Sequence, residues 1–171
     1  AGRLGATGAT GEAAAAAPKP PFADNAQFTW GLQATGAATS PQSGAGIKVA
    51  VLDTGFDVGH PDFAGRNVTT QSFVAGETVQ DGHGHGTHCI GTSCGSKAPD
   101  TGPRYGVAYG ASIFAGKVLG DNGSGSDGNI IAGINWAIEN QCPGGVIVSI
   151  GSSDQNLAMA RCSGVMDLPV W

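Results

Sequence analysis

A short apolar run places the strongest restriction on the fold of this chain. Residues 47–52, Ile-Lys-Val-Ala-Val-Leu, are almost continuously apolar and rich in β-branched side chains. Such a run is typical of a strand that is buried on both faces, as in a parallel sheet between layers of helices. Residues 146–150, Val-Ile-Val-Ser-Ile, form a second strong candidate strand, and residues 114–119 form a weaker one.

A helix is predicted between the last two candidate strands. Apolar side chains fall on one helical face at Ile130, Ile131, Ile134, Ala137 and Ile138. Ser126 or Asp127 can cap the start of this helix, and the Pro-Gly-Gly run at 143–145 ends it. A strand, a helix and a strand in this order form a βαβ unit, whose two strands must run parallel. The predicted fold class is therefore α/β, with a parallel sheet covered by helices.

The chain divides into a tail and one domain. Residues 1–24 are rich in glycine and alanine and contain a Pro-Lys-Pro-Pro run near their end. This composition is typical of a low-complexity linker or tail without a core of its own. Residues 25–171 have the length and apolar content of a single domain.

The balance of charges argues against two classes of partner. Charged residues make up 12% of the chain, and the net charge of −5 at pH 7 comes from scattered carboxylates. Because there is no basic block, we expect no binding to nucleic acid or to an anionic membrane surface. No apolar run approaches the roughly 20 residues that span a bilayer. The chain begins with alanine and has no signal sequence, so we expect any targeting segment to have been removed.

Polar or glycine-rich residues end or follow each of the three candidate strands. Asp53 comes directly after the first strand, residues 120–125 follow the second, and residues 149–153 close the third. In such sheets the reactive groups gather beyond the carboxyl ends of the strands. We therefore expect Asp53 and the two loops to share one edge of the sheet.

Three of the four histidines lie in the segment Asp-Gly-His-Gly-His-Gly-Thr-His-Cys at 81–89. His83, His85 and His88 match the H-x-H-x-x-H spacing of the metallo-β-lactamase superfamily. Thr87, however, stands where that pattern has an acid, and no histidine follows residue 88, so no metal site is predicted. We expect His83 to be a solvated loop residue, and His88 to be buried and hydrogen-bonded on a helix over 86–95.

The sequence around His85 sets this histidine apart. Asp-Thr-Gly at 53–55 is followed, 32 positions after Asp53, by His-Gly-Thr-His-Cys-Ile-Gly-Thr. Together with residues 49–63, 105–138 and 146–151, these motifs resemble the subtilisin-like serine peptidases (subtilases), above all their proteinase K-like branch. The resemblance covers roughly residues 25–155. It implies a subtilisin-like three-layer α/β fold, of which this chain holds only the N-terminal part of the catalytic domain.

The resemblance also assigns roles to single residues. His85 would be the general base that takes the proton of a serine hydroxyl, and Asp53 would accept the other N–H of the ring. The substrate-binding residues that it implies are Gly123, Ser124, Gly125, Ser149, Ile150 and Gly151. Two backbone segments of this kind hold a polypeptide substrate by adding it as a strand. Without the resemblance either glycine loop would be an ordinary turn. No cofactor is implied for catalysis, and secretion is implied.

The four cysteines are Cys89, Cys94, Cys142 and Cys162. No pair of them has the spacing of a zinc knuckle, so a structural zinc ion is not expected. By the resemblance, Cys89 takes the place of a free cysteine beneath the catalytic histidine. At most one disulfide then remains among the other three, and the sequence does not say which pair forms it.

Two parts of the implied site are absent from residues 1–171. These are the Gly-Thr-Ser-Met-Ala-x-Pro motif of the family's nucleophile and the asparagine of its oxyanion hole. Ser93 is no substitute, because eight residues of helix place it about 12 Å from His85. We therefore expect a serine endopeptidase whose serine and asparagine come from a companion chain of the same precursor. The fragment alone should be inactive.

A structural calcium ion is an additional hypothesis. Asp62, in His-Pro-Asp-Phe, stands where several subtilases have a calcium ligand, although the later loop Ser-Lys-Ala-Pro-Asp-Thr-Gly-Pro-Arg does not match the rest of that site.

Two other classes of function fit part of the sequence. Val-Leu-Asp-Thr-Gly at 51–55 also fits the strand-borne aspartate of an aspartic peptidase, and a second Asp-Thr-Gly occurs at 100–102. That site needs two carboxylates that share a proton, and the second motif has no strand before it and a proline after it. The main alternative is a catalytically inactive subtilase-derived module, which keeps the peptide-binding groove and has lost the nucleophile.

Overall fold

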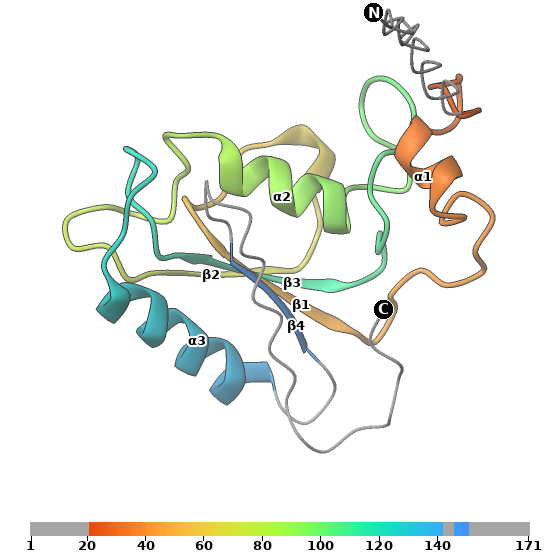
Figure 1. The fold of residues 1–171 in the computed structure, drawn as a ribbon. Helices are drawn as coiled ribbons and strands as arrows, with labels where there is room; N and C mark the ends of the chain where they lie inside the picture. The colour runs from red at the N-terminus through yellow and green to blue at the C-terminus, as the bar shows by residue number, and fades with distance from the viewer. Residues whose placement is uncertain (1–20, 142–145, 151–171) are drawn as a thin grey trace, which may run out of the picture.

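A four-stranded parallel sheet forms the centre of the molecule (Figure 1). The computed structural model describes residues 21–141 and 146–150. The strands are β1 (Lys48–Asp53), β2 (Val68–Ser72), β3 (Ser112–Lys117) and β4 (Val146–Ile150). Their order across the sheet is β2-β3-β1-β4, so β1 pairs on one side with β3 and on the other with β4.

Helices cover both faces of this sheet. The helix α2 (His85–Cys94) lies against one face and α3 (Asp127–Gln141) against the other (Figure 1). Two shorter elements, α1 (Trp30–Ala34) and the 3-10 helix η1 (Pro61–Phe63), lie outside the sheet. The α/β fold with a parallel sheet covered by helices is therefore confirmed, and the sheet is open.

The apolar run of β1 feeds two separate cores. Successive side chains of a strand point to opposite faces. Val49 and Val51 pack with Ile90 of α2 in one cluster, while Leu52 packs with Ala137 of α3 in the other. Burying one such side chain fully is worth about 1.5–3 kcal/mol. A strand between two helical layers thus has to be apolar at nearly every position.

The predicted helix over 126–142 is confirmed in its start, and three of the five apolar residues predicted to share its buried face, Ile130, Ile134 and Ala137, pack in the core. The N–H of Asn129 donates to Ser126 Oγ over 3.2 Å, so Ser126 caps the first turn of α3. Ala137 is fully buried against the sheet, but Ile131 and Ile138 are 57% and 41% exposed. Each residue turns a helix by about 100°, which carries this second pair past the edge of the buried stripe.

The structure contains one strand that the sequence does not predict, and the boundaries of two predicted strands differ. The sequence predicts no strand at 68–72, because Val-Thr-Thr-Gln-Ser is polar; β2 is an edge strand with mostly exposed side chains, and it forms by pairing with β3. The strand β1 starts and ends one residue later than predicted, at Lys48 and Asp53, and β3 starts and ends two residues earlier, at Ser112 and Lys117.

Several sequence predictions fall on residues that the structure does not describe. They concern the tail up to residue 20, the Pro-Gly-Gly run at 143–145, Gly151, Cys142 and Cys162. Asp24, the last residue of the predicted tail, contacts the domain, because its Oδ1 accepts a hydrogen bond of 2.6 Å from Trp30 N. None of the helices in the described ranges has the length and apolar character needed to cross a bilayer.

Candidate active site

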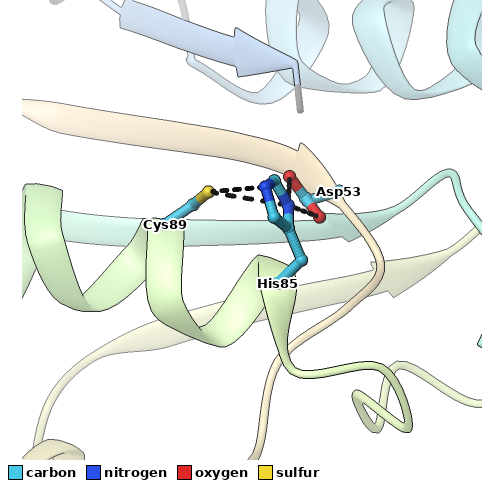
Figure 2. A group of neighbouring side chains, drawn as sticks. All are labelled: Asp53, His85 and Cys89. Atoms are coloured by element: carbon cyan, nitrogen blue, oxygen red, sulfur yellow. Dashed lines mark hydrogen bonds and ion pairs between the residues drawn. The ribbon is translucent and has the colours of Figure 1, made fainter. Parts of the chain in front are cut away.

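Asp53 and His85 form a hydrogen-bonded pair at the carboxyl edge of the sheet (Figure 2). His85 Nδ1 lies 2.8 Å from Asp53 Oδ1 and 3.0 Å from Oδ2. The Asp53 side chain is 1% exposed, whereas that of His85 is 46% exposed. Because an ionised carboxylate only accepts hydrogen bonds, the ring carries its proton on Nδ1. In the neutral ring, Nε2 is then the atom that can accept a proton from a third group.

A close approach of two backbone segments brings the pair together. His85 is the first residue of α2, and the next residue, Gly86, is buried against the turn that follows β1. A Cβ atom on Gly86 would overlap the carbonyl oxygen of Gly55 and lie 3.2 Å from the Cβ of Asp53. Gly86 N donates to Thr54 Oγ1 over 2.9 Å. Only glycine lets α2 begin so near the end of β1.

A single carboxylate fixes the loop that carries His85. We call residues 81–87 the histidine loop. Asp81 accepts hydrogen bonds of 2.7–3.1 Å from Thr54 Oγ1, His83 N, Gly84 N, Thr87 N and Thr87 Oγ1. Burial opposes ionisation of Asp81, but these donors outweigh it and hold the pKa of the carboxyl well below its usual range. A charged Asp81 therefore accepts hydrogen bonds from the N–H groups at the N-terminus of α2 and interacts favourably with the dipole of this helix.

Cys89 lies one turn along α2 from His85, with its sulfur against the imidazole ring (Figure 2). Its Sγ is 3.7 Å from Nδ1 and 3.9 Å from Nε2. Burial and the Asp53 carboxylate raise the pKa of the Cys89 thiol to about 11. Cys89 and Cys94 are both free thiols. Cys142 and Cys162, with which Cys94 could pair, lie outside the described residues, so the disulfide stays a prediction.

The same three side chains are the candidate ligands for a metal ion. One ligand atom each of Asp53, His85 and Cys89 lies within 4.8 Å of the others. A metal would need the thiolate form of Cys89, and its raised pKa disfavours that form at neutral pH. Within residues 21–141 and 146–150, His83 and His88 do not join His85 in a metal-binding group, so the zinc-hydrolase pattern is not assembled.

The two predicted substrate-binding segments flank the end of β1. The loop of Gly123, Ser124 and Gly125 is a tight turn after β3, in which Gly120 N donates to Ser124 O over 2.8 Å. It lies beside the histidine loop, because a Cβ on Gly123 would come within 3.1 Å of His83 Nε2. On the other side, β4 places the backbone of Ser149 and Ile150 opposite Val51 and Leu52.

The other two loop histidines have different outcomes. His83 is exposed, as predicted, and its ring centroid is 6.3 Å from that of His85. The prediction that His88 is buried and packed is wrong, since its side chain is exposed. The buried face of α2 is formed by Gly86, Ile90, Gly91 and Cys94. Residue 88 lies two positions from both 86 and 90, which puts it on the opposite side of the helix.

A separate pocket of about 530 Å³ lies beside the first turns of α2. Its lining includes His60, Asp62, His88 and Tyr105, but neither Asp53 nor His85. Asp62 accepts hydrogen bonds from Asp100 N over 2.7 Å and from the Tyr105 hydroxyl over 2.5 Å. Both Asp62 oxygens are therefore engaged by donors. Calcium binding here stays a prediction, which the thermal midpoint with calcium and with a chelator would test.

Two residues that could act as alternative catalytic groups, Asp100 and Ser93, do not lie where they could act with Asp53 or His85. The second Asp-Thr-Gly begins at Asp100, an exposed loop residue whose N–H bonds Asp62, so it does not pair with Asp53 as an aspartic peptidase requires. Ser93 donates its hydroxyl to Cys89 O over 2.8 Å, within α2. Neither supplies a nucleophile to His85.

The sequence interpretation missed three residues that hold the site together, namely Thr54, Asp81 and Lys117. Thr54 and Asp81 carried a readable signal, because each stands next to a motif residue and can cap or turn a chain end. Lys117 carried none. It ends an apolar strand, where a lysine is expected to reach the solvent, yet its side chain is fully buried.

Comparison with known proteins identifies the family of this chain. The model of the subtilase family matches residues 44–167. An alkaline serine protease, ver112, of Corniculantispora psalliotae is 41% identical over an alignment of 150 residues, and the match covers 78% of this chain and 37% of that protein. Proteinase R of Parengyodontium album is 38% identical over 84% of this chain and 40% of its own length. The chain thus spans about two fifths of these relatives.

Solved structures with similar folds lead to the same family. Sphericase has a TM-score of 0.54 and 36% identity, over 68% of this chain and 41% of its own. A cold-adapted subtilisin-like serine proteinase has a TM-score of 0.53 and 27% identity, over 65% of this chain and 48% of its own.

Proposed function

Because this chain belongs to the subtilase family of serine peptidases, we propose that the full-length protein is an endopeptidase in which Asp53 and His85 supply two members of an Asp-His-Ser triad. The observation that carries the proposal is the 2.8 Å contact between His85 Nδ1 and Asp53 Oδ1. It joins a buried carboxylate to a half-exposed imidazole, the arrangement that a general base needs.

The proton path follows from the tautomer of His85. With Nδ1–H donated to Asp53, Nε2 accepts the proton of a serine hydroxyl as that oxygen attacks the peptide carbonyl. The same nitrogen then returns the proton to the leaving amine. Asp53 keeps the ring oriented and stabilises the imidazolium that forms between the two transfers. Its burial strengthens this interaction, because the effective dielectric constant there is lower than in water.

We place the serine and the oxyanion-hole asparagine on a companion chain from the same precursor. One observation supports this placement. The strand β4 forms one edge of the described sheet, with β1 as its partner. A following parallel strand would add to that edge and bring further residues to the carboxyl end. On this proposal residues 1–171 are inactive alone.

Polypeptides are the proposed substrates. An extended peptide would add as a strand to the backbone of Gly123, Ser124 and Gly125, with the segment Ser149–Gly151 on its other side. The tight turn at Gly120–Ser124 and its position next to the histidine loop support this role. Secretion is part of the proposal, since the relatives include a cuticle-degrading protease of Metarhizium anisopliae.

A serine-directed fluorophosphonate tests the proposal on the full-length, processed protein. We expect the reagent to abolish peptide hydrolysis and to label one serine outside residues 1–171. Labelling should require the Asp53–His85 pair, so a His85→Ala variant should react slowly with the reagent. Peptide binding without hydrolysis or labelling would instead identify an inactive peptide-binding module, and a label on Ser93 would refute the assignment of the nucleophile.

A further inference from the structure

Lys117 is the largest fully buried side chain of the described residues and ends in an ammonium group. It ends β3, directly opposite Asp53 in the register of the sheet. An ammonium group has three N–H donors. The structure offers three acceptors: the carbonyl oxygen of Thr54, Asp121 Oδ1 at 2.7 Å and Glu77 Oε2 at 3.2 Å. A buried charge of this kind is tolerated only when it is paired in this way.

The first acceptor connects Lys117 to the Asp53 side of the catalytic pair. Thr54 uses all of its polar groups at this point of the fold. Its N–H donates to Asp53 Oδ1 over 2.7 Å, its carbonyl accepts from Lys117, and its hydroxyl bonds both Asp81 and Gly86. The ammonium thus holds the peptide unit that follows Thr54, and through Thr54, whose N–H donates to Asp53 Oδ1, it supports the orientation of the Asp53 carboxylate.

The second acceptor connects Lys117 to the His85 side. Asp121 Oδ1 also accepts a hydrogen bond of 3.0 Å from Gly82 N, in the histidine loop. The Lys117 ammonium and the Gly82 N–H hold the pKa of the Asp121 carboxyl below its usual range. Glu77 closes the arrangement, because its Oε2 accepts from Asp121 N over 3.1 Å. One ammonium therefore reaches the backbone around both members of the pair.

We propose that Lys117 is a positioning residue for catalysis, which sets the distance and angle between Asp53 and His85 by tying the Thr54 carbonyl and, through Asp121, the histidine loop to the end of β3. This inference rests on the proposed function. An apolar side chain could fill the same volume, but it would leave the Thr54 carbonyl and two carboxylates without their common donor. Loss of the ammonium would therefore disturb the geometry of the Asp53–His85 pair rather than the packing of the core.

A pair of lysine variants in the full-length protein tests this role. Lys117→Met keeps the length of the side chain and removes the ammonium. We expect kcat per folded molecule to fall about 10²-fold with KM nearly unchanged, because a misplacement of about 1 Å in a catalytic group costs that much. The control is Lys48→Met, at the start of β1, whose ammonium donates to Asn140 O at 3.4 Å and lies 5.9 Å from the centroid of the Phe114 ring. It should retain kcat within about twofold.

The low-field proton resonance of His85 Nδ1 gives a second readout that does not depend on turnover. It should shift or broaden in Lys117→Met and stay unchanged in Lys48→Met. If the wild-type protein hydrolyses no peptide, the proposed function fails, and this resonance alone decides the placement of Lys117.

Asp121→Asn is the variant that decides if Lys117→Met does not fold. The Asp121 side chain is 53% exposed, so we expect the fold to tolerate the substitution. The substitution should nevertheless weaken the hydrogen bond from Gly82 N. We expect a smaller fall in kcat, about tenfold, and a shift of the same resonance. Unchanged kcat and an unchanged resonance in Asp121→Asn, or in a folded Lys117→Met, would overturn the proposal.

Discussion

Two loops of this molecule are each held by one carboxylate, but to different degrees. Asp81 accepts five hydrogen bonds within the histidine loop and from the end of β1. Asp62 accepts two, which pin the loop around Asp100 and Tyr105. Both carboxyl groups have lowered pKa values, because donated hydrogen bonds outweigh the burial that opposes ionisation.

The difference follows from what each loop carries. The loop around Tyr105 packs against α2 and η1 and carries neither member of the proposed catalytic pair. The histidine loop carries the proposed general base, whose ring must stay within hydrogen-bonding distance of Asp53. Its position is set several times over, by Asp81, by the Gly86–Gly55 contact and by Asp121. The predictions below break these anchors one at a time, in the fluorophosphonate-inactivated full-length protein unless stated otherwise.

The largest loss of stability is expected from Asp81→Asn. The amide cannot accept at both positions, and one of its ends becomes a donor that faces donors from Thr87 or Gly84. We expect the free energy of unfolding at pH 7 to fall by about 3 kcal/mol, as measured by urea denaturation. A loss as small as that of an exposed carboxylate would show that the histidine loop does not depend on Asp81.

The effect of Asp81→Asn should also depend on pH. The pKa of Asp81 is lower in the folded protein than the ordinary value of 3.8, so its stabilising contribution is complete above that value. The contribution is lost as the pH falls further towards the folded value. The difference between wild type and variant should therefore be constant from pH 5 to 8 and shrink below about pH 4. A difference that grows on acidification would contradict the assigned ionisation.

A matched pair of glycine variants separates the close approach of α2 from helix propensity. Gly86→Ala places a methyl group against the backbone of Gly55, so we expect a loss of about 2 kcal/mol and a longer Asp53–His85 distance. Gly128→Ala, in the first turn of α3, meets only Ser126 Oγ at 3.8 Å. It should stabilise the protein by about 0.5 kcal/mol, and equal destabilisation by both changes would contradict the close-packing argument.

The smallest effect is expected at the second loop. Asp62→Asn can still accept one hydrogen bond, from either Asp100 N or the Tyr105 hydroxyl, so the free energy of unfolding should fall by only about 1 kcal/mol. Peptidase activity of the uninhibited variant should stay within about twofold of wild type, as progress curves on a peptide substrate would show. A loss as large as that of Asp81→Asn would remove the difference between the loops.

The parts of this fold that the sequence predicts are those set by local patterns. The apolar run of β1 and the 3.6-residue period of α3 each follow from burial on defined faces, and their order forces parallel pairing. The contact between Asp53 and His85 was predicted from the motifs at 53–55 and 85–92, and the observed 2.8 Å agrees with that prediction.

The missed features depend on partners that are distant in the sequence. The strand β2 has no apolar pattern and forms because β3 supplies its hydrogen bonds. Lys117 is buried because Thr54, 63 positions earlier, offers a carbonyl to its ammonium and Glu77 and Asp121 offer carboxylates. The exposure of His88 depends on which face of α2 meets the sheet. Three of the four buried residues of this ten-residue helix are small, so its sequence gives a weak signal for that choice.

The most direct test of the central claim compares two histidines of the same loop. His83 and His85 are both exposed and their ring centroids are 6.3 Å apart, but only His85 contacts Asp53. We would measure kcat/KM on a peptide substrate for His85→Ala and His83→Ala in the full-length protein. The account predicts a loss of about 10³-fold or more for His85→Ala, the size of a general-base contribution, while His83→Ala keeps most of its activity. Comparable losses from the two changes would contradict it and point to a site in which both rings act together.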